Sequence, residues 1–190
     1  MFSVIFPGQG SQSVGMTKDL YNNYSYIKDL FKHADETLGY SITKLILEGP
    51  KEELDLTKNT QPAIFLSSFS IFEMIRRESK LKLSDAKYFA GHSLGEYSAL
   101  ASAGSLDFES ALKLLHERGK SMQTSVPRGM GGMLAILGAD IKDISSLLDE
   151  NKSSYKCYIA NDNSNGQIVL SGLNSDIEKV SNDLKNKNIK

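Results

Sequence analysis

Cysteine, histidine and tryptophan are the residues that this sequence has least of. Its 190 residues include one cysteine, three histidines and no tryptophan. A single cysteine, Cys157, excludes an intrachain disulfide framework, and without a cluster of cysteine and histidine there is no pattern of zinc ligands. We therefore expect no metal site, and we interpret Cys157 as a residue of a buried strand.

Long apolar runs and an excess of charge are also lacking. No run approaches the roughly 20 apolar residues of a membrane span, and the first residues lack the basic region of a secretory signal. The 22 basic and 23 acidic residues leave a net charge of −1, so no electrostatic feature favours nucleic acid as a partner. The sequence predicts a globular, cytoplasmic protein with neither membrane nor nucleic acid among its partners.

The most informative segment that is present runs Gly91-His92-Ser93-Leu94-Gly95. It has the G-x-S-x-G pattern of a nucleophile elbow, a sharp turn between a strand and a helix that exposes a serine. Residues 87–90 favour a short β-strand, and the alanine-rich residues 96–103 favour a helix. Ser93 would then lie at a helix N-terminus, with the N–H of Leu94 free to donate. A glycine-rich turn with an incidental serine is the simpler alternative.

A second glycine-rich loop follows the first predicted strand. Residues 2–6 are mostly apolar and predict this strand, and Pro7-Gly8-Gln9-Gly10-Ser11-Gln12 comes directly after it. Glycines in such a loop let backbone N–H groups approach a ligand closely. The loop lacks the Lys-Ser/Thr ending of a phosphate loop and the complete G-x-G-x-x-G of a dinucleotide site. By itself it is equally consistent with an ordinary turn after a strand.

The rest of the sequence predicts alternating elements in two parts. In the first part we expect helices over 24–38, from Pro62 to about residue 75, and over 108–122 with Asp107 as N-cap and Ala111, Leu114 and Leu115 on the buried face. Residues 43–47 indicate a short helical turn. Residues 127–132 contain one proline and three glycines and predict a hinge. Strand, helix, strand, strand and helix follow over 133–137, 141–148, 155–160, 167–171 and 175–186, the order of a ferredoxin-like unit without its last strand.

Several separated segments, taken in order, resemble the malonyl-CoA:acyl carrier protein transacylase family. They are the two glycine-rich loops, Asn59-Thr60-Gln61-Pro62-Ala63, Glu117-Arg118-Gly119, residues 131–138, and Asn161-Asp162-Asn163 with residues 166–172. The set is specific and covers essentially all 190 residues, although no single motif is specific alone. The resemblance implies an α/β fold: an α/β-hydrolase-like large domain over 1–126, the hinge over 127–132, and an inserted ferredoxin-like subdomain over 133–190. It also implies that both domains are incomplete at the C-terminal end.

The resemblance assigns a role to each matching residue of the site. Ser93 is the acyl acceptor, and Arg118 binds the free carboxylate of the malonyl group as a planar fork of donors. The oxyanion hole is formed by N–H groups of Gln9 and Leu94. The residues that line the pocket are His92, Gln61, Asn161 and Asn163. From the residues alone, Arg118 would more simply be a solvated arginine paired with Glu117 or Glu96, and turn roles for the two asparagines are equally favoured.

None of the three histidines is predicted to be the general base. His92 is adjacent to Ser93 but lines the site in this family, and His33 and His116 are interpreted as surface or interface residues. The family's base is a histidine that follows the ferredoxin-like subdomain, and no residue here matches it. We therefore expect these 190 residues by themselves to transfer malonyl poorly or not at all.

The implied reaction is a two-step transfer of malonyl from coenzyme A to the phosphopantetheine thiol of acyl carrier protein in fatty acid biosynthesis. A malonyl ester of Ser93 is the intermediate, malonyl-CoA and acyl carrier protein are substrates, and neither metal nor organic cofactor is required. Two alternatives stay open from the residues. One is a serine esterase or thioesterase of the α/β-hydrolase type, although no histidine follows His116. The other is a non-catalytic fragment that lacks its base.

Overall fold

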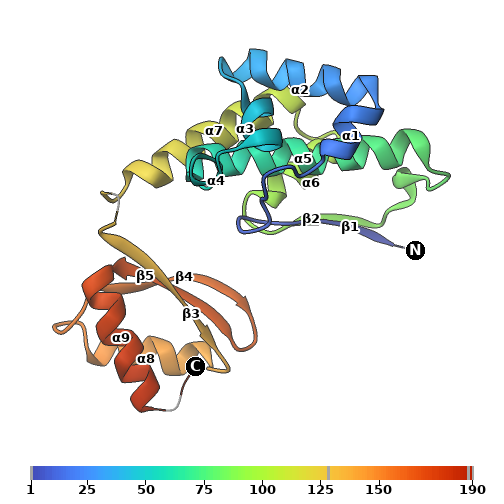
Figure 1. Ribbon diagram of the computed structural model, residues 1–190. Coiled ribbons are helices and arrows are strands. Elements are labelled where there is room, and N and C mark those ends of the chain that lie inside the picture. The colour runs from blue at the N-terminus through green and yellow to red at the C-terminus, as the bar shows by residue number, and fades with distance from the viewer. Residues whose placement is uncertain (1, 128, 188, 190) are drawn as a thin grey trace. The chain divides into compact units, whose positions relative to one another are not determined.

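Figure 1 shows the computed structural model of the chain, which describes residues 2–127, 129–187 and 189. The chain divides into two compact units, residues 1–123 and residues 124–190. Each unit has its own buried hydrophobic cluster, and each is described by itself below. Among the described residues, no helix is both long and apolar enough to cross a membrane.

The first unit contains a two-stranded parallel sheet covered by helices. Strand β1 (Ser3–Phe6) pairs with β2 (Tyr88–Gly91) in the register Ser3↔Tyr88 to Phe6↔Gly91. Because parallel neighbours need a long crossover, the chain between them forms most of the unit's helices. These are α1 (Lys18–Asn23), α2 (Ser25–Leu38), α3 (Ile42–Glu48), α4 (Lys51–Leu54), α5 (Thr57–Glu78) and a 3-10 turn (Leu83–Asp85). Helices α6 (Gly95–Ser102) and α7 (Phe108–Thr124) follow β2.

Helix α5 is the central element of this unit. Every residue from 59 to 68 is buried, so this part of the helix is covered on all sides. In Figure 1 it passes between α2 and the β1–β2 sheet, and α6 packs on both strands. Phe31 from α2, Phe65 and Leu66 from α5, and Leu112 from α7 are fully buried in the main cluster. The helices that carry Gln61 and Arg118 are thereby anchored in the core.

Most predicted elements of the first unit are present, with three corrections. Pro62 does not begin a helix but lies inside α5, which starts five residues earlier at Thr57. Residues 43–47 belong to a complete helix, α3, whose N-cap Ser41 accepts a hydrogen bond from Lys44 N. Leu114 is 50% exposed, and Leu112 takes its place in the core. The buried stripe of α7 contains residues 111, 112, 115 and 119, and Leu114 lies outside that helical repeat.

The second unit is a three-stranded antiparallel sheet with two helices. Strands β3 (Gly131–Leu137), β4 (Cys157–Ser164) and β5 (Gln167–Leu173) are arranged in the order β3-β5-β4. Helix α8 (Ile141–Glu150) connects β3 to β4, and α9 (Asn174–Asn186) follows β5. The predicted order of elements is therefore confirmed over the described residues. The core of the unit includes Ile136, Ile144, Ile168, Leu170 and Val180.

Two boundaries in the second unit differ from the sequence prediction. Gly131 and Gly132 belong to β3, where both pair with β5, so they are not hinge residues. Arg128, in the middle of the predicted hinge, lies outside the described residues. Strand β4 continues to Ser164, so Asn161 and Asn163 are strand residues and the suggested turn role is wrong. Breaks in the register after Ile159 and Asp162 let the strand continue through these polar residues. Cys157 is buried at the start of β4, as expected.

Candidate active site

Ser93 lies on the sharp turn between β2 and α6 that the G-x-S-x-G pattern predicts. Its φ is 55°, in the left-handed region that non-glycine residues rarely adopt. The turn is held by hydrogen bonds from Gly95 N to the His92 carbonyl (2.9 Å) and from Glu96 N to the Ser93 carbonyl (3.1 Å). The strand, the strained serine and the helix that follows it are the geometry of a nucleophile elbow. The Ser93 side chain is exposed at this turn.

The glycines of the motif are required by close backbone contacts. A Cβ at Gly91 would lie 1.9 Å from the Gly95 carbonyl carbon, so no larger residue fits where strand and helix meet. A Cβ at Gly95 would lie 2.6 Å from the carbonyl oxygen of Phe6, the last residue of β1. His92 N also donates to the Phe6 carbonyl at 3.2 Å. These contacts place the elbow directly beside the first glycine-rich loop.

Arg118 extends from α7 to the Ser93 hydroxyl. Its Nη2 donates to Ser93 Oγ at 3.0 Å, and its Nη1 donates to Gln61 Oε1 at 2.7 Å. Glu117 pairs with Lys120 instead, and within the described residues Arg118 forms no ion pair. The simpler interpretation of Arg118 as a solvated arginine paired with Glu117 or Glu96 is therefore wrong. A guanidinium beside the nucleophile can bind an anionic group attached to that nucleophile.

Gln61 connects the arginine to the core. Its side chain is fully buried on α5, where Oε1 accepts from Arg118 and Nε2 contacts Met122 Sδ at 3.1 Å. A buried amide with both ends occupied has a single orientation, so it fixes the position of the guanidinium that it contacts. The structure thus brings together Ser93, Arg118 and Gln61 from three segments that are distant in sequence.

Two backbone N–H groups have no acceptor among the described residues, one directly after Ser93 and one in the first glycine-rich loop. Within the described part of the chain, the amides of Gln9 and Leu94 have no hydrogen-bond acceptor. The neighbouring amide, Gly10 N, donates to Gln12 Oε1 at 2.9 Å, and Gln12 Nε2 donates to Asp55 Oδ1 at 2.9 Å. The hydrogen bonds from Gln12 and Lys51 hold the pKa of the Asp55 carboxyl below its usual range. The side chain of Gln12 therefore ties the loop that carries Gln9 to the end of α4.

No histidine of the described residues is hydrogen-bonded to Ser93. His33 Nε2 lies 3.8 Å from Glu109 Oε2 on the surface, and its ring contacts Phe108. His116 Nδ1 lies 3.1 Å from the Lys58 carbonyl oxygen. These positions agree with the prediction that neither residue is the base. Asn161 and Asn163 lie on β4 of the second unit, half-buried and exposed respectively, and their assignment to the pocket stays a prediction. Within the described residues, no group of three or more potential metal ligands is present.

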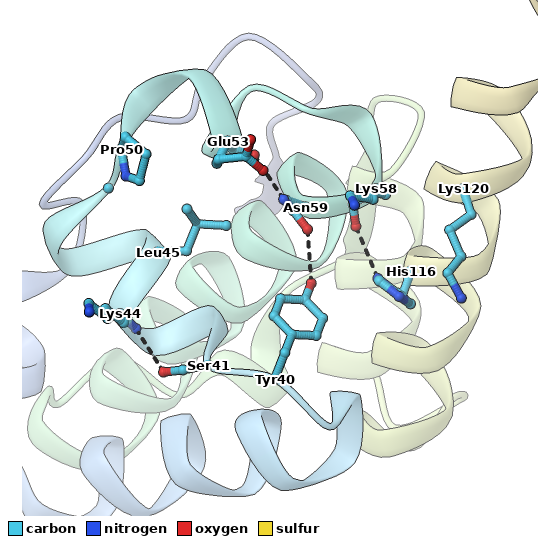
Figure 2. A pocket seen from close by; sticks show the side chains of 11 residues that line it. Tyr40, Ser41, Lys44, Leu45, Pro50, Glu53, Lys58, Asn59, His116 and Lys120 are labelled. Atoms are coloured by element: carbon cyan, nitrogen blue, oxygen red, sulfur yellow. Dashed lines mark hydrogen bonds between the residues drawn. The ribbon is translucent and has the colours of Figure 1, made fainter.

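Sequence reasoning missed the cluster around His116. Figure 2 shows Tyr40, Asn59 and His116 among the side chains that line an open cavity. The cavity has a volume of about 460 Å³ and is lined by residues between 40 and 53 and by residues of α5 and α7. The lining of this cavity does not include Ser93, Gln61 or Arg118, although the last two lie on the same helices. A proline within a helix was the available signal, because it leaves the carbonyl four residues earlier without its helical donor.

The comparisons with known proteins agree with this geometry. The sequence profile described as "Acyl transferase domain" matches residues 3–190. The chain belongs to the acyl transferase domain family. It is 42% identical over 179 residues to the malonyl CoA-acyl carrier protein transacylase of Haemophilus influenzae. This match covers 94% of the chain and 57% of that relative. It is 44% identical over 178 residues to the transacylase of the same name from Bacillus subtilis, covering 93% and 55%.

Solved structures show the same relationship for this member of the family. The malonyl CoA-acyl carrier protein transacylase from Coxiella burnetii covers 100% of the chain with a TM-score of 0.90 and 38% identity. A malonyl-transacylase solved in complex with a type II polyketide synthase acyl-carrier protein also covers 100%, with a TM-score of 0.88 and 38% identity. The chain spans 59% and 60% of these two proteins, and 57% and 55% of the two curated relatives. It therefore spans somewhat more than half of the length of the proteins that it matches.

Proposed function

We propose that the protein to which this chain belongs transfers a malonyl group from coenzyme A to the phosphopantetheine thiol of an acyl carrier protein. The observation that carries this proposal is the contact of Arg118 with both Gln61 and Ser93. A hydrolase of simple esters has no need of a fixed guanidinium at its nucleophile. A malonyl ester of Ser93, in contrast, carries a free carboxylate, which is the group that a guanidinium binds best.

The proposed reaction has two balanced steps. Ser93 Oγ forms a bond to the thioester carbonyl carbon while its proton leaves to a base, and the C–S bond breaks to release coenzyme A as a thiol. The acyl carrier protein's thiol then attacks the malonyl-serine ester, and Ser93 recovers its proton as the C–O bond breaks. The amides of Gln9 and Leu94 are the proposed donors to the oxyanion that forms in each step.

The general base is proposed to lie outside these 190 residues. His33 and His116 have other partners, and His92 is not hydrogen-bonded to Ser93. The resemblance supplies a histidine from the part of such proteins that follows the ferredoxin-like subdomain. His92, Asn161 and Asn163 are proposed to line the acyl pocket, and no cofactor or metal takes part.

We also propose the finer fold assignment. The first unit has the strand, elbow and helix of an α/β-hydrolase-like domain, and the large domain would extend over residues 1–126. The βαββα order of the second unit, with strands in the order β3-β5-β4, supports a ferredoxin-like subdomain that begins with β3 at Gly131. In that fold a further strand pairs with the free edge of β3.

Mass spectrometry of the acylated protein tests the proposed function. The full-length protein that contains this chain is incubated with malonyl-CoA, and its peptides are then analysed. We expect a malonyl adduct on the peptide that contains Ser93 and its transfer to acyl carrier protein on addition of that partner. Rapid release of free malonate without transfer would instead show a thioesterase. An adduct that persists in Ser93→Ala would refute Ser93 as the acceptor.

A further inference from the structure

Pro62 leaves one carbonyl of α5 without a helical partner. It is the sixth residue of the helix and has no N–H to donate to Lys58, four residues earlier. In the structure, His116 Nδ1 of α7 lies 3.1 Å from the Lys58 carbonyl oxygen. A carbonyl only accepts, so Nδ1 carries the proton and donates to it. The imidazole thus replaces the helical hydrogen bond that Pro62 removes and makes it a bond between two helices.

The same face of α7 makes a close backbone contact with α5. A Cβ at Gly119 would lie 2.6 Å from the Thr57 carbonyl oxygen and 2.7 Å from the Lys58 Cα, so only glycine allows this approach. His116 and Gly119 are three residues apart and share one face of the helix. Gln123, four residues further along, accepts from Lys58 N at 3.3 Å. Three successive turns of α7 are therefore held against the first two residues of α5.

Arg118 lies on the stretch of α7 that makes this contact. Arg118 is between His116 and Gly119 on α7, and its partner Gln61 is one turn after Lys58 on α5. A slip of one residue moves a helix by about 1.5 Å along its axis and rotates it by about 100°. Hydrogen bonds of 2.7 and 3.0 Å, from Arg118 to Gln61 and Ser93, do not survive such a shift.

Tyr40 and Asn59 hold the imidazole in place. The rings of Tyr40 and His116 have centroids 5.5 Å apart, and the Tyr40 hydroxyl donates to Asn59 Oδ1 at 3.2 Å (Figure 2). Asn59 Nδ2 in turn donates to the Glu53 carbonyl at 2.9 Å. Burial, with a contribution from the charge of Asp35, raises the pKa of Tyr40 well above its usual range, so the hydroxyl remains a donor at all physiological pH values. The imidazole is therefore fixed from α5 and from the segment before α3.

We propose that His116 is a positioning residue for malonyl recognition, which sets the register of α7 on α5 and thereby holds Arg118 beside Ser93. This inference rests on the proposed function, because Arg118 matters for the acyl group only if that group carries a carboxylate. It assigns to the cluster in Figure 2 a role in the choice between malonyl-CoA and acetyl-CoA, although the cluster does not contact the acyl group.

The test compares two substitutions of His116 and one control substitution in the full-length protein. His116→Leu keeps a side chain of similar size and removes the N–H that donates to the Lys58 carbonyl. His116→Asn places an amide N–H near the position of Nδ1. His33→Leu is the matched control, because it removes the other histidine that lies away from Ser93. For each variant, the kcat/KM values for formation of acyl-Ser93 from malonyl-CoA and from acetyl-CoA are measured, together with the melting temperature.

We expect His116→Leu to lower malonyl kcat/KM about three- to tenfold, as for the loss of one net hydrogen bond, with little change for acetyl-CoA. His116→Asn should recover most of the loss, and His33→Leu should match the parent. Equal losses for both donors, or no loss at all, would overturn the proposal. If the parent forms no acyl-Ser93, the proposed function itself fails. If the parent reacts and His116→Leu keeps the parent's preference for malonyl-CoA over acetyl-CoA, only the inference about His116 fails.

The double variant Pro62→Ala, His116→Leu separates stability from positioning. The Pro62→Ala substitution supplies the backbone N–H that proline lacks, so the Lys58 carbonyl would be paired again within α5. We expect the melting temperature to recover relative to His116→Leu, whereas the malonyl preference stays reduced because the hydrogen bond from residue 116 of α7 to the Lys58 carbonyl of α5 is still missing. Recovery of both quantities together would show that His116 only satisfies a buried carbonyl.

Discussion

Replacement of Arg118 is the most direct test of how this site selects its acyl group. The guanidinium donates to Ser93 Oγ and to Gln61 Oε1, so it occupies the space next to the nucleophile while anchored to a buried amide. Arg118→Ala removes the charge and both hydrogen-bond donors but leaves the amides of Gln9 and Leu94, the proposed oxyanion donors, and the elbow unchanged. The expected effect is therefore on donors with a carboxylate and not on acyl transfer in general.

The magnitude follows from the contacts that Arg118 can make. A hydrogen bond to a charged group contributes about 1.5–3 kcal/mol, which corresponds to a loss of roughly 10- to 150-fold in malonyl kcat/KM. Acetyl kcat/KM should be unchanged or higher. Arg118→Lys keeps the charge but loses the planar fork, so it should recover only part of the malonyl rate.

The assay measures kcat/KM for both acyl-CoA donors in the full-length protein, with Arg76→Ala as the control. Arg76 lies on α5 and pairs with Glu73 on the surface, so its loss should leave both rates unchanged. Equal losses of malonyl and acetyl transfer in Arg118→Ala, with an unchanged melting temperature, would refute the argument that the guanidinium binds the carboxylate. In that case its contact with the Ser93 hydroxyl would be the catalytically important one.

Two further predictions concern stability. Leu112→Ala should lower the free energy of unfolding by about 2–5 kcal/mol because Leu112 is fully buried. Leu114→Ala should change it by less than about 0.5 kcal/mol because the Leu114 side chain is 50% exposed. Similar values for the two variants in urea unfolding would contradict the assignment of the buried face. The pKa of Asp55 is lower in the folded state than its ordinary value because Gln12 and Lys51 donate to the carboxylate, so this contribution is present above about pH 4 and is lost as the pH falls through the folded-state pKa. Asp55→Asn should therefore melt at a lower temperature than the parent at pH 7 and at nearly the same temperature at the acid end of a pH series, and a difference that persists at low pH would contradict this account.

The sequence predicted the elements whose signals are local. The strand, Gly91-His92-Ser93-Leu94-Gly95 and the helix after them form an elbow because each segment favours its own conformation without distant help. The N-cap Asp107 is a similar case, since its Oδ1 accepts from Ser110 N at 2.8 Å within one turn. The prediction that α5 begins near Pro62 was wrong because proline favours the first turn only weakly. Burial of the residues before and after Pro62 stabilises a helix that begins earlier, at Thr57. Asn161 and Asn163 failed as turn residues because pairing with β5 extends the strand through them.

By itself, the sequence predicted the turn that carries Ser93, the order of the elements and the set of residues that resemble the transacylase family, because motifs and periodicity are properties of neighbouring residues. Only the tertiary structure decided what Arg118 does. In sequence it lies beside Glu117, and a salt bridge on the surface was the simplest expectation. The close packing of α7 on α5 instead points the guanidinium at Gln61 and Ser93, which are 57 and 25 residues away along the chain. The contact that sets this packing joins His116 to a carbonyl released by Pro62, and such a pairing depends on two helices meeting in space.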